Sequence, residues 1–171
     1  DNSITENTRV GYPLNFIANI APEGVAPIPK TIFFLAADAF GVLPPISKLD
    51  KNSAAYHFVS GYTSKLAGTE DGVTEPEATF STCFGEPFLP LDPLLYAQQF
   101  QRRVKKAGAN VFLINTGWVG GSYGTGKRIP IKFTRAMINA AIDGELDFVS
   151  YERDPYFNLN IPKFCPGVPQ E

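Results

Sequence analysis

The sequence has 171 residues with a formal net charge of −2, and 44% of them are hydrophobic. This length and composition suit one globular domain with its own core. The charge gives no electrostatic reason to expect nucleic acid or an anionic membrane as a partner. No apolar run approaches the ~20 residues of a membrane-spanning helix, and no signal-peptide pattern opens the sequence.

The first third of the chain predicts one strand and one helix after a turn-rich start. Residues 1–30 contain too many turn formers for a long helix, namely Pro13, Pro22, Gly24, Pro27 and Pro29. The continuous apolar run of residues 31–35 predicts a strand buried on both faces, and a loop follows from Ala37 to Pro45. Apolar side chains at helical spacing then predict a helix over roughly Ser53 to Ala67, with Gly61 in its interior.

The middle of the chain predicts a long connection and a second helix. Residues 68–85 are rich in glycine and short polar residues, which is typical of functional lids and of disordered loops. Asp92 as N-cap and Pro93 as the first helical residue open a helix that ends before Gly108. Cations in its last turns oppose the negative end of the helix dipole, and we prefer this interpretation to a nucleic-acid patch.

The last third predicts a strand, a glycine-rich loop and a helix. The strand covers residues 111–114, five glycines lie between Gly117 and Gly126, and a helix is expected from about Thr134 to Asp143. The tail from Leu146 holds four prolines, which predicts an extended and irregular course. Alternating strands and helices predict an α/β layer with at least two neighbouring parallel strands.

The glycine-rich loop is the first chemical candidate. Residues 121–127 match the first seven positions of a Walker A loop, G-x-x-x-x-G-K, but Arg128 stands where the Mg²⁺-binding Ser or Thr is required. Thr134 is the better N-cap, so the helix would start too late to cradle phosphate. We therefore expect either a structural connection or one wall of a nucleotide site whose phosphate loop lies elsewhere, with Arg128 facing the ligand.

The remaining candidates are weak when taken one at a time. His57 has no second histidine with which to share a metal, and we interpret it as a structural residue of a helix. Asp38 follows a buried strand, where α/β folds place their ligand sites, but alone it would be an ordinary surface ion. Arg9 would be equally ordinary. Cys83 and Cys165 belong to no CxxC pair and are interpreted as reduced thiols, with a disulfide as the alternative.

Several short motifs of the sequence, taken together and in order, form a specific pattern. They are Glu6-Asn-Thr-Arg9 with Tyr12-Pro13, Asp38-Ala-Phe-Gly-Val-Leu-Pro-Pro45, Tyr56-His-Phe, Ser60-Gly-Tyr-Thr63, Leu66-Ala-Gly-Thr-Glu70, Thr74-Glu-Pro76, Ala78-Thr-Phe-Ser81, Cys83-Phe-Gly85, Asn115-Thr-Gly-Trp118 and Gly126-Lys-Arg-Ile129. From about Thr5 to Val168 the chain resembles the carboxy-terminal part of the ATP-dependent phosphoenolpyruvate carboxykinases.

This resemblance implies a fold and a reaction. The fold would be α/β, a mixed sheet with flanking helices, as part of a carboxy-terminal mononucleotide-binding domain. The enzymes of this family act in gluconeogenesis in the cytoplasm, where they convert oxaloacetate and ATP to phosphoenolpyruvate, ADP and CO₂ with bound Mg²⁺ and Mn²⁺. The implied partners are these small substrates and the remainder of the same polypeptide, with no nucleic acid and no membrane.

The resemblance also assigns roles to residues. Arg9 falls on the arginine that faces the transferred phosphoryl group and the substrate. Arg128, Ile129 and Thr134 fall on positions that contact ATP on its nucleoside side. Residues 68–85 correspond to a mobile lid that closes over the substrate.

The family's phosphate loop, its metal ligands and its oxaloacetate-binding residues precede the Glu6–Arg9 word. We therefore expect a single segment, 1–171, that is incomplete at both ends, binds no metal itself and is inactive alone. The alternative is a non-catalytic nucleotide-binding or interaction module with the same fold, and a self-contained P-loop enzyme is disfavoured by Arg128.

Overall fold

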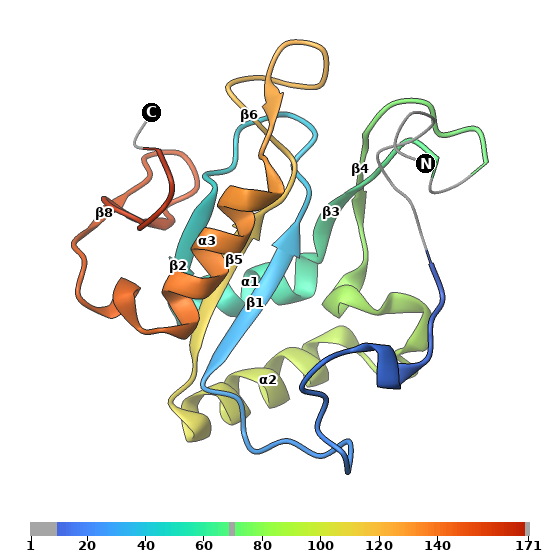
Figure 1. The fold of residues 1–171 in the computed structure, drawn as a ribbon, viewed down its shortest axis with the longest axis vertical. Helices are drawn as coiled ribbons and strands as arrows, with labels where there is room; N and C mark the ends of the chain where they lie inside the picture. Colours follow the sequence, from blue (N-terminus) through green and yellow to red (C-terminus); the bar gives the residue numbers. More distant parts are fainter. Residues whose placement is uncertain (1–9, 69–70, 170–171) are drawn as a thin grey trace.

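The computed structural model describes residues 10–68 and 71–169, which form a mixed sheet covered by helices on both faces (Figure 1). Within these residues, five strands follow the order β1-β5-β2-β9-β8. Their bounds are Thr31–Ala36 for β1, Asn110–Asn115 for β5, Ile46–Leu49 for β2, Asn160–Pro162 for β9 and Tyr151–Arg153 for β8. Strands β1 and β5 are parallel and the other neighbours are antiparallel. The α/β fold with a mixed sheet and flanking helices is confirmed.

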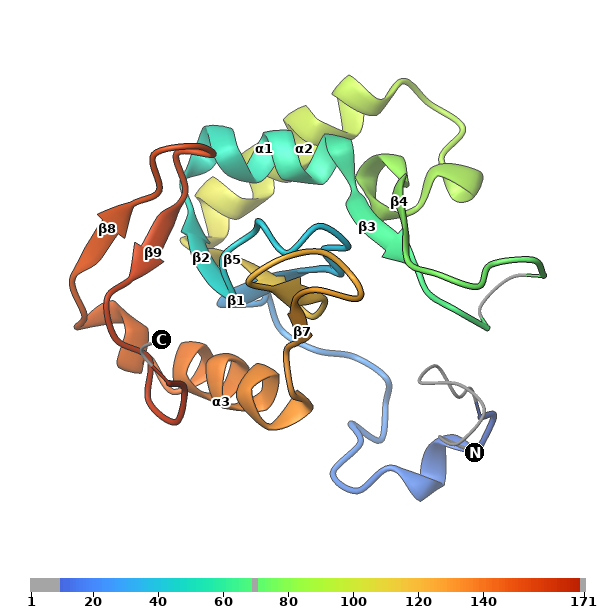
Figure 2. The same ribbon diagram turned by 90° about the horizontal axis from the view of Figure 1, so that it is seen from above.

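One core lies on each face of the sheet. Helix α3 (Ile131–Ile142) covers one face, while α1 (Lys51–Ser60) and α2 (Pro93–Ala107) cover the other (Figure 2). Under α3, the fully buried Met137 packs with Phe112 and Ile114 of β5. Alternate β5 residues, Val111 and Leu113, face α1 and α2 instead. Strand β5 is therefore the central strand shared by both cores.

Two elements match their predictions closely. Helix α2 begins at Pro93, with the Asp92 side chain accepting a hydrogen bond from the backbone N–H of Leu94, and ends at the left-handed Gly108. Strand β1 covers the predicted run and pairs with β5 in parallel. It is not buried on both faces as expected, because β1 is an edge strand and Leu35 is 52% exposed.

The helix expected over Ser53–Ala67 is wrong at its carboxyl end. Helix α1 stops at Ser60, and Gly61 adopts a left-handed conformation with its N–H donating to the carbonyl of His57. Strand β3 (Tyr62–Lys65) follows directly. Phe58 and Tyr62 pack on the same core, as their spacing predicts, but Phe58 lies near the end of helix α1 and Tyr62 at the start of strand β3.

Three further predictions need correction. Residues 68–85 are not wholly irregular, because β4 (Glu77–Phe80) pairs with β3 and a short 3-10 turn follows at Thr82–Phe84. Helix α3 starts at Ile131 rather than Thr134, with Pro130 as its N-cap. The tail from residue 146 supplies β8 and β9, which extend the sheet. The short antiparallel pair β6 (Trp118–Val119) and β7 (Lys127–Arg128) was also missed.

Gly61 should tolerate alanine far less well than Gly108, although both end a helix in the left-handed region. A Cβ at Gly61 would lie 1.7 Å from the carbonyl oxygen of Ser81, whereas one at Gly108 would meet nothing within 4 Å. We expect Gly108→Ala to cost about 1–2 kcal/mol of unfolding free energy from backbone strain alone. Gly61→Ala should cost about 1–3 kcal/mol more through overpacking. Urea unfolding of both variants measures the difference, and equal losses would contradict the close packing at Gly61.

Candidate functional site

Two loops meet where the parallel strands β1 and β5 end. Residues 37–45 leave the carboxyl end of β1, and residues 116–130 leave the carboxyl end of β5 beside it (Figures 1 and 2). Ligand sites of α/β proteins lie at such carboxyl edges. The position of these loops therefore makes them the candidate site.

Asp38 anchors the first loop from inside the protein. Its side chain is 0% exposed, so the interpretation of Asp38 as a surface ion is wrong. Oδ1 accepts hydrogen bonds from the Phe40 N–H and the Tyr62 hydroxyl, both at 2.9 Å. Oδ2 accepts from the Val42 and Leu43 N–H groups at 2.6 and 2.7 Å. Four donors satisfy the buried carboxylate, which is therefore a structural anchor of the loop.

Asn115, the last residue of β5, ties the two loops together. Its Oδ1 accepts from the backbone N–H groups of Asp38 (3.1 Å) and Gly117 (2.8 Å). Its Nδ2 donates to the carbonyls of Leu43 (3.1 Å) and Trp118 (3.0 Å). One fully buried amide thus bonds two backbone groups of each loop. The sequence analysis names Asn115 only as part of a motif shared with the family. A polar residue at the end of an apolar strand could have indicated its role at the site.

Glycines allow the two loop backbones to touch. A Cβ on Gly117 would lie 2.3 Å from the Asp38 nitrogen, and a Cβ on Gly41 would lie 2.0 Å from the Gly121 carbonyl oxygen. No side chain fits at either position without moving the backbone opposite. Close packing between the two loops therefore explains Gly117 in the second loop and Gly41 in the first.

The structure excludes a Walker A arrangement at this loop. Lys127 and Arg128 form strand β7, and α3 begins only at Ile131. The backbone between Gly121 and Arg128 thus does not lead into a helix N-terminus that would cradle phosphate. A hollow of about 480 Å³ does lie beside the loop, and it is lined by Pro45, Val119, Gly120, Thr125, Gly126 and Lys127.

Arg128 lies near the end of the second loop, in β7. It is half-buried, its guanidinium carbon lies 5.4 Å from the centre of the Trp118 ring, and its Nε donates to the Thr116 carbonyl at 3.4 Å. Ile129 and Thr134 are only 8% and 9% exposed, and Ile129 packs in the core under α3. Arg128 and Ile129 are thus neighbours at the end of the loop and Thr134 lies in the first turn of α3, while Arg9 lies outside the described residues.

The β3–β4 hairpin is fastened to the same edge of the sheet. Thr63 Oγ1 accepts from the Ala37 N–H at 3.2 Å, and Ser64 Oγ donates to the Ala37 carbonyl. The Tyr62 hydroxyl reaches Asp38, and burial together with that carboxylate raises the pKa of Tyr62 to about 12. Tyr62 is therefore a hydrogen-bond donor throughout the physiological range and holds the base of the hairpin against the loop.

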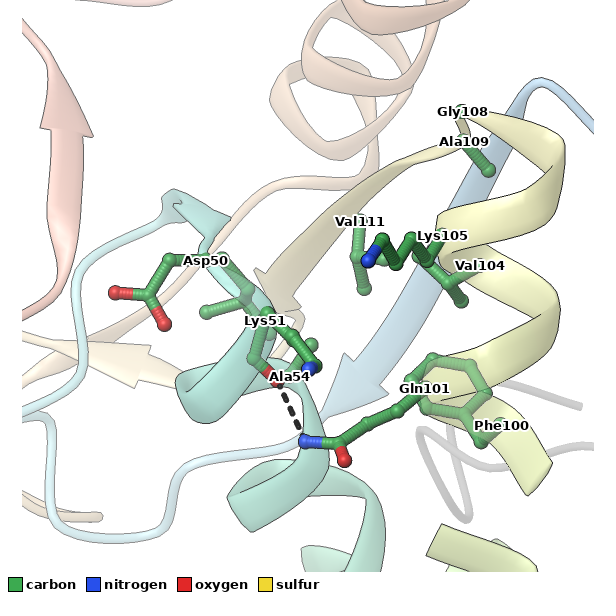
Figure 3. Close-up of a pocket in the computed structure, with 11 residues that line it drawn as sticks. Asp50, Lys51, Ala54, Phe100, Gln101, Val104, Lys105, Gly108, Ala109 and Val111 are labelled. Carbon is green, nitrogen blue, oxygen red and sulfur yellow. Dashed lines mark hydrogen bonds between the residues drawn. The ribbon is translucent and has the colours of Figure 1, made fainter. Parts of the chain in front are cut away.

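Other hollows lie away from this edge. The one drawn in Figure 3 has a volume of about 450 Å³ and is reached by Ala54 and Lys51 from α1 and by Phe100, Val104 and Lys105 from α2. Gln101 Nε2 donates to the Lys51 carbonyl at 3.3 Å across its border. It opens near the start of β5, at Ala109 and Val111, and none of the expected site residues lines it.

No metal centre is evident in the described part of the chain. Within residues 10–68 and 71–169, no three His, Cys, Asp or Glu side chains come together as ligands would. Cys83 and Cys165 are both free thiols, which confirms the interpretation of reduced cysteines. In the same ranges, no helix combines the length and the apolar character needed to cross a bilayer.

The comparisons with known proteins agree with the resemblance. The model of a family described as phosphoenolpyruvate carboxykinase matches residues 1–171. A protein of Caldanaerobacter subterraneus subsp. tengcongensis named phosphoenolpyruvate carboxykinase (ATP) is 62% identical over 98% of this chain and 32% of its own length. Proteins of the same name from Fusobacterium nucleatum subsp. nucleatum and Lysinibacillus sphaericus are 60% and 59% identical over the whole chain. The chain spans about a third of the length of these relatives.

His57 should make the protein less stable as the pH falls below about 6.5, the usual pKa of histidine. Burial lowers the pKa of His57, so the unfolded state binds the proton first and stability decreases with falling pH until the folded pKa is passed. We expect the melting temperature of the unaltered protein, relative to His57→Gln, to decline between pH 7 and pH 5. A constant difference across that range would show that the imidazole is freely solvated.

Proposed function

Because the chain belongs to the ATP-dependent phosphoenolpyruvate carboxykinase family, we propose that it is the part of such an enzyme that supplies the nucleoside wall of the ATP site. The whole enzyme would convert oxaloacetate and ATP to phosphoenolpyruvate, ADP and CO₂. The observation that carries this proposal is the family match over all 171 residues, at 62% identity to one named relative.

Charge neutralisation and positioning dominate this type of chemistry. Decarboxylation leaves an enolate, and phosphoryl transfer to it develops charge on the transferred group, which cations and aligned donors stabilise. The family uses ATP with divalent metal ions, and we propose Mg²⁺ and Mn²⁺ as the metals. By the family resemblance, we assign the metal ligands to other parts of the polypeptide.

We propose that Arg128, Ile129 and Thr134 contact ATP on its nucleoside side. The half-buried Arg128 lies at the carboxyl edge of the parallel strands, where nucleotide sites of α/β folds occur. Ile129 and Thr134 expose little side-chain surface, so their contribution would be a small apolar and polar rim beside Arg128. Arg9 would face the transferred phosphoryl group, in line with the family position that it matches.

We further propose that residues 68–85 act as a lid within this single segment, 1–171. The β3–β4 hairpin is held at its base by Tyr62, Thr63 and Ser64, whereas its far end, from Asp71 to Glu75, is almost wholly exposed. An anchored base with an exposed far end suits a lid that closes over substrate and excludes water.

Oxaloacetate-dependent formation of phosphoenolpyruvate tests the function. The enzyme that contains this chain should form phosphoenolpyruvate from oxaloacetate and ATP in the presence of Mg²⁺ and Mn²⁺, and the isolated 171 residues should not. ATP binding without turnover by the complete protein would favour the alternative, a non-catalytic nucleotide-binding module. Full turnover by the isolated segment would contradict the assignment of the metal and phosphate groups to other parts of the polypeptide.

Arg9→Ala should lower kcat more than it changes the KM for ATP. The negative charge that Arg9 would face develops during phosphoryl transfer, so its loss removes stabilisation of the transition state. We expect a fall in kcat of about 10²–10³-fold, as for other lost electrostatic donors. Arg102→Ala, on the exposed face of α2, is the matched control and should behave like the unaltered enzyme. A change confined to the KM for ATP would place Arg9 away from the phosphoryl group.

A further inference from the structure

Trp118 and Thr116 both contact the side chain of Arg128. Trp118 and Arg128 are directly opposite each other in the β6–β7 pair, and the guanidinium carbon lies 5.4 Å from the centre of the indole ring. Arg128 Nε also donates to the Thr116 carbonyl at 3.4 Å. A guanidinium is attracted to an aromatic face and stacks on it. The ring and the carbonyl therefore both favour one orientation of the guanidinium.

Trp118 itself is firmly placed. The residue is 5% exposed, its backbone N–H donates to the Asp38 carbonyl at 2.9 Å, and its backbone carbonyl accepts from Asn115 Nδ2 at 3.0 Å. Both partners are fully buried residues of the anchor that joins the two loops. The indole ring thus has a fixed position relative to the carboxyl edge of β1 and β5.

We propose that Trp118 is a positioning residue for the adenine nucleotide, acting through Arg128. The proposal rests on the proposed function, in which Arg128 contacts ATP on its nucleoside side. An arginine side chain has many rotamers, and fixing one of them when a ligand binds costs conformational entropy that weakens binding. The buried ring fixes the guanidinium before ATP arrives and therefore strengthens binding without touching ATP.

A purely structural role for Trp118 would have different consequences. Loss of a core aromatic lowers thermal stability and disturbs every kinetic parameter, whatever residue stands at position 128. A positioning role raises the KM and the dissociation constant for ATP, leaves the KM for oxaloacetate unchanged, and vanishes once Arg128 has been removed.

A double-mutant cycle in the full-length enzyme separates the two roles. The variants are Trp118→Leu, Trp118→Phe, Arg128→Met and the Leu/Met double mutant, each measured by steady-state kinetics, calorimetric ATP titration and thermal unfolding. Phe100→Leu is the matched control, since it removes an aromatic ring that stacks with Phe58 in the core of the opposite face. It should lower the melting temperature and leave ATP binding unchanged.

We expect Trp118→Leu to weaken ATP binding about three- to tenfold, the range of a cation–π contact. Trp118→Phe, which keeps an aromatic face, should stay within about twofold. In the double mutant, Trp118→Leu should add nothing to the effect of Arg128→Met. Additive losses, or an equal rise in the KM for oxaloacetate, would overturn the proposal.

The outcomes also distinguish this proposal from the proposed function. If Arg128→Met leaves ATP binding intact in an active enzyme, the positioning role is overturned while the family activity stands. If the unaltered protein binds ATP but forms no phosphoenolpyruvate, the proposed function fails, and the calorimetric cycle still decides whether Trp118 and Arg128 are coupled.

Discussion

The hydrogen bonds of two buried polar side chains, Asp38 and Asn115, are the constraint on which the candidate site depends. Strands β1 and β5 end side by side, and the loops that leave them carry backbone N–H and C=O groups that a sheet no longer satisfies. Asp38 accepts from three backbone groups of its own loop, and Asn115 bonds to both loops. An unpaired buried polar group costs about 1–3 kcal/mol, so removal of either side chain would leave several such groups exposed to an apolar core.

The glycines and the polar anchor depend on each other. Asn115 can reach the Asp38 N–H because Gly117 has no Cβ to hold the chains apart. The same close approach lets the backbone N–H of Trp118 donate to the Asp38 carbonyl. The pairing of β6 with β7 then places Arg128 directly opposite Trp118. The contact between the loop backbones therefore fixes the indole ring, and the ring in turn orients Arg128, the arginine proposed to contact ATP on its nucleoside side.

Local chemistry decided which parts of the fold were predictable. The Asp92, Pro93 and Gly108 signals act within one turn of helix, and they marked α2 correctly. The predicted start of α3, Thr134, lies after the observed start at Ile131, because Pro130 begins the helix without a side-chain cap. Strand β2 pairs with β9 at Lys48 and Asn160, residues far apart in the chain, and no local pattern encodes such a pairing. For the site, Arg128, Ile129 and Thr134 came from family resemblance, whereas the stacking of Arg128 on Trp118 required the strand register.

The anchor also links the proposed lid to the proposed nucleotide wall. The Tyr62 hydroxyl donates to Asp38, and hydrogen bonds to charged groups contribute about 1.5–3 kcal/mol. Thr63 and Ser64 add two bonds to Ala37, so movement of β3 at its base would break several contacts at once. A lid built on this hairpin would therefore move at its far end, where the residues from Asp71 to Glu75 are mostly exposed. The base of the hairpin would stay bonded to Asp38, whose backbone also holds Trp118. Lid closure and nucleotide binding would then both depend on the same buried anchor.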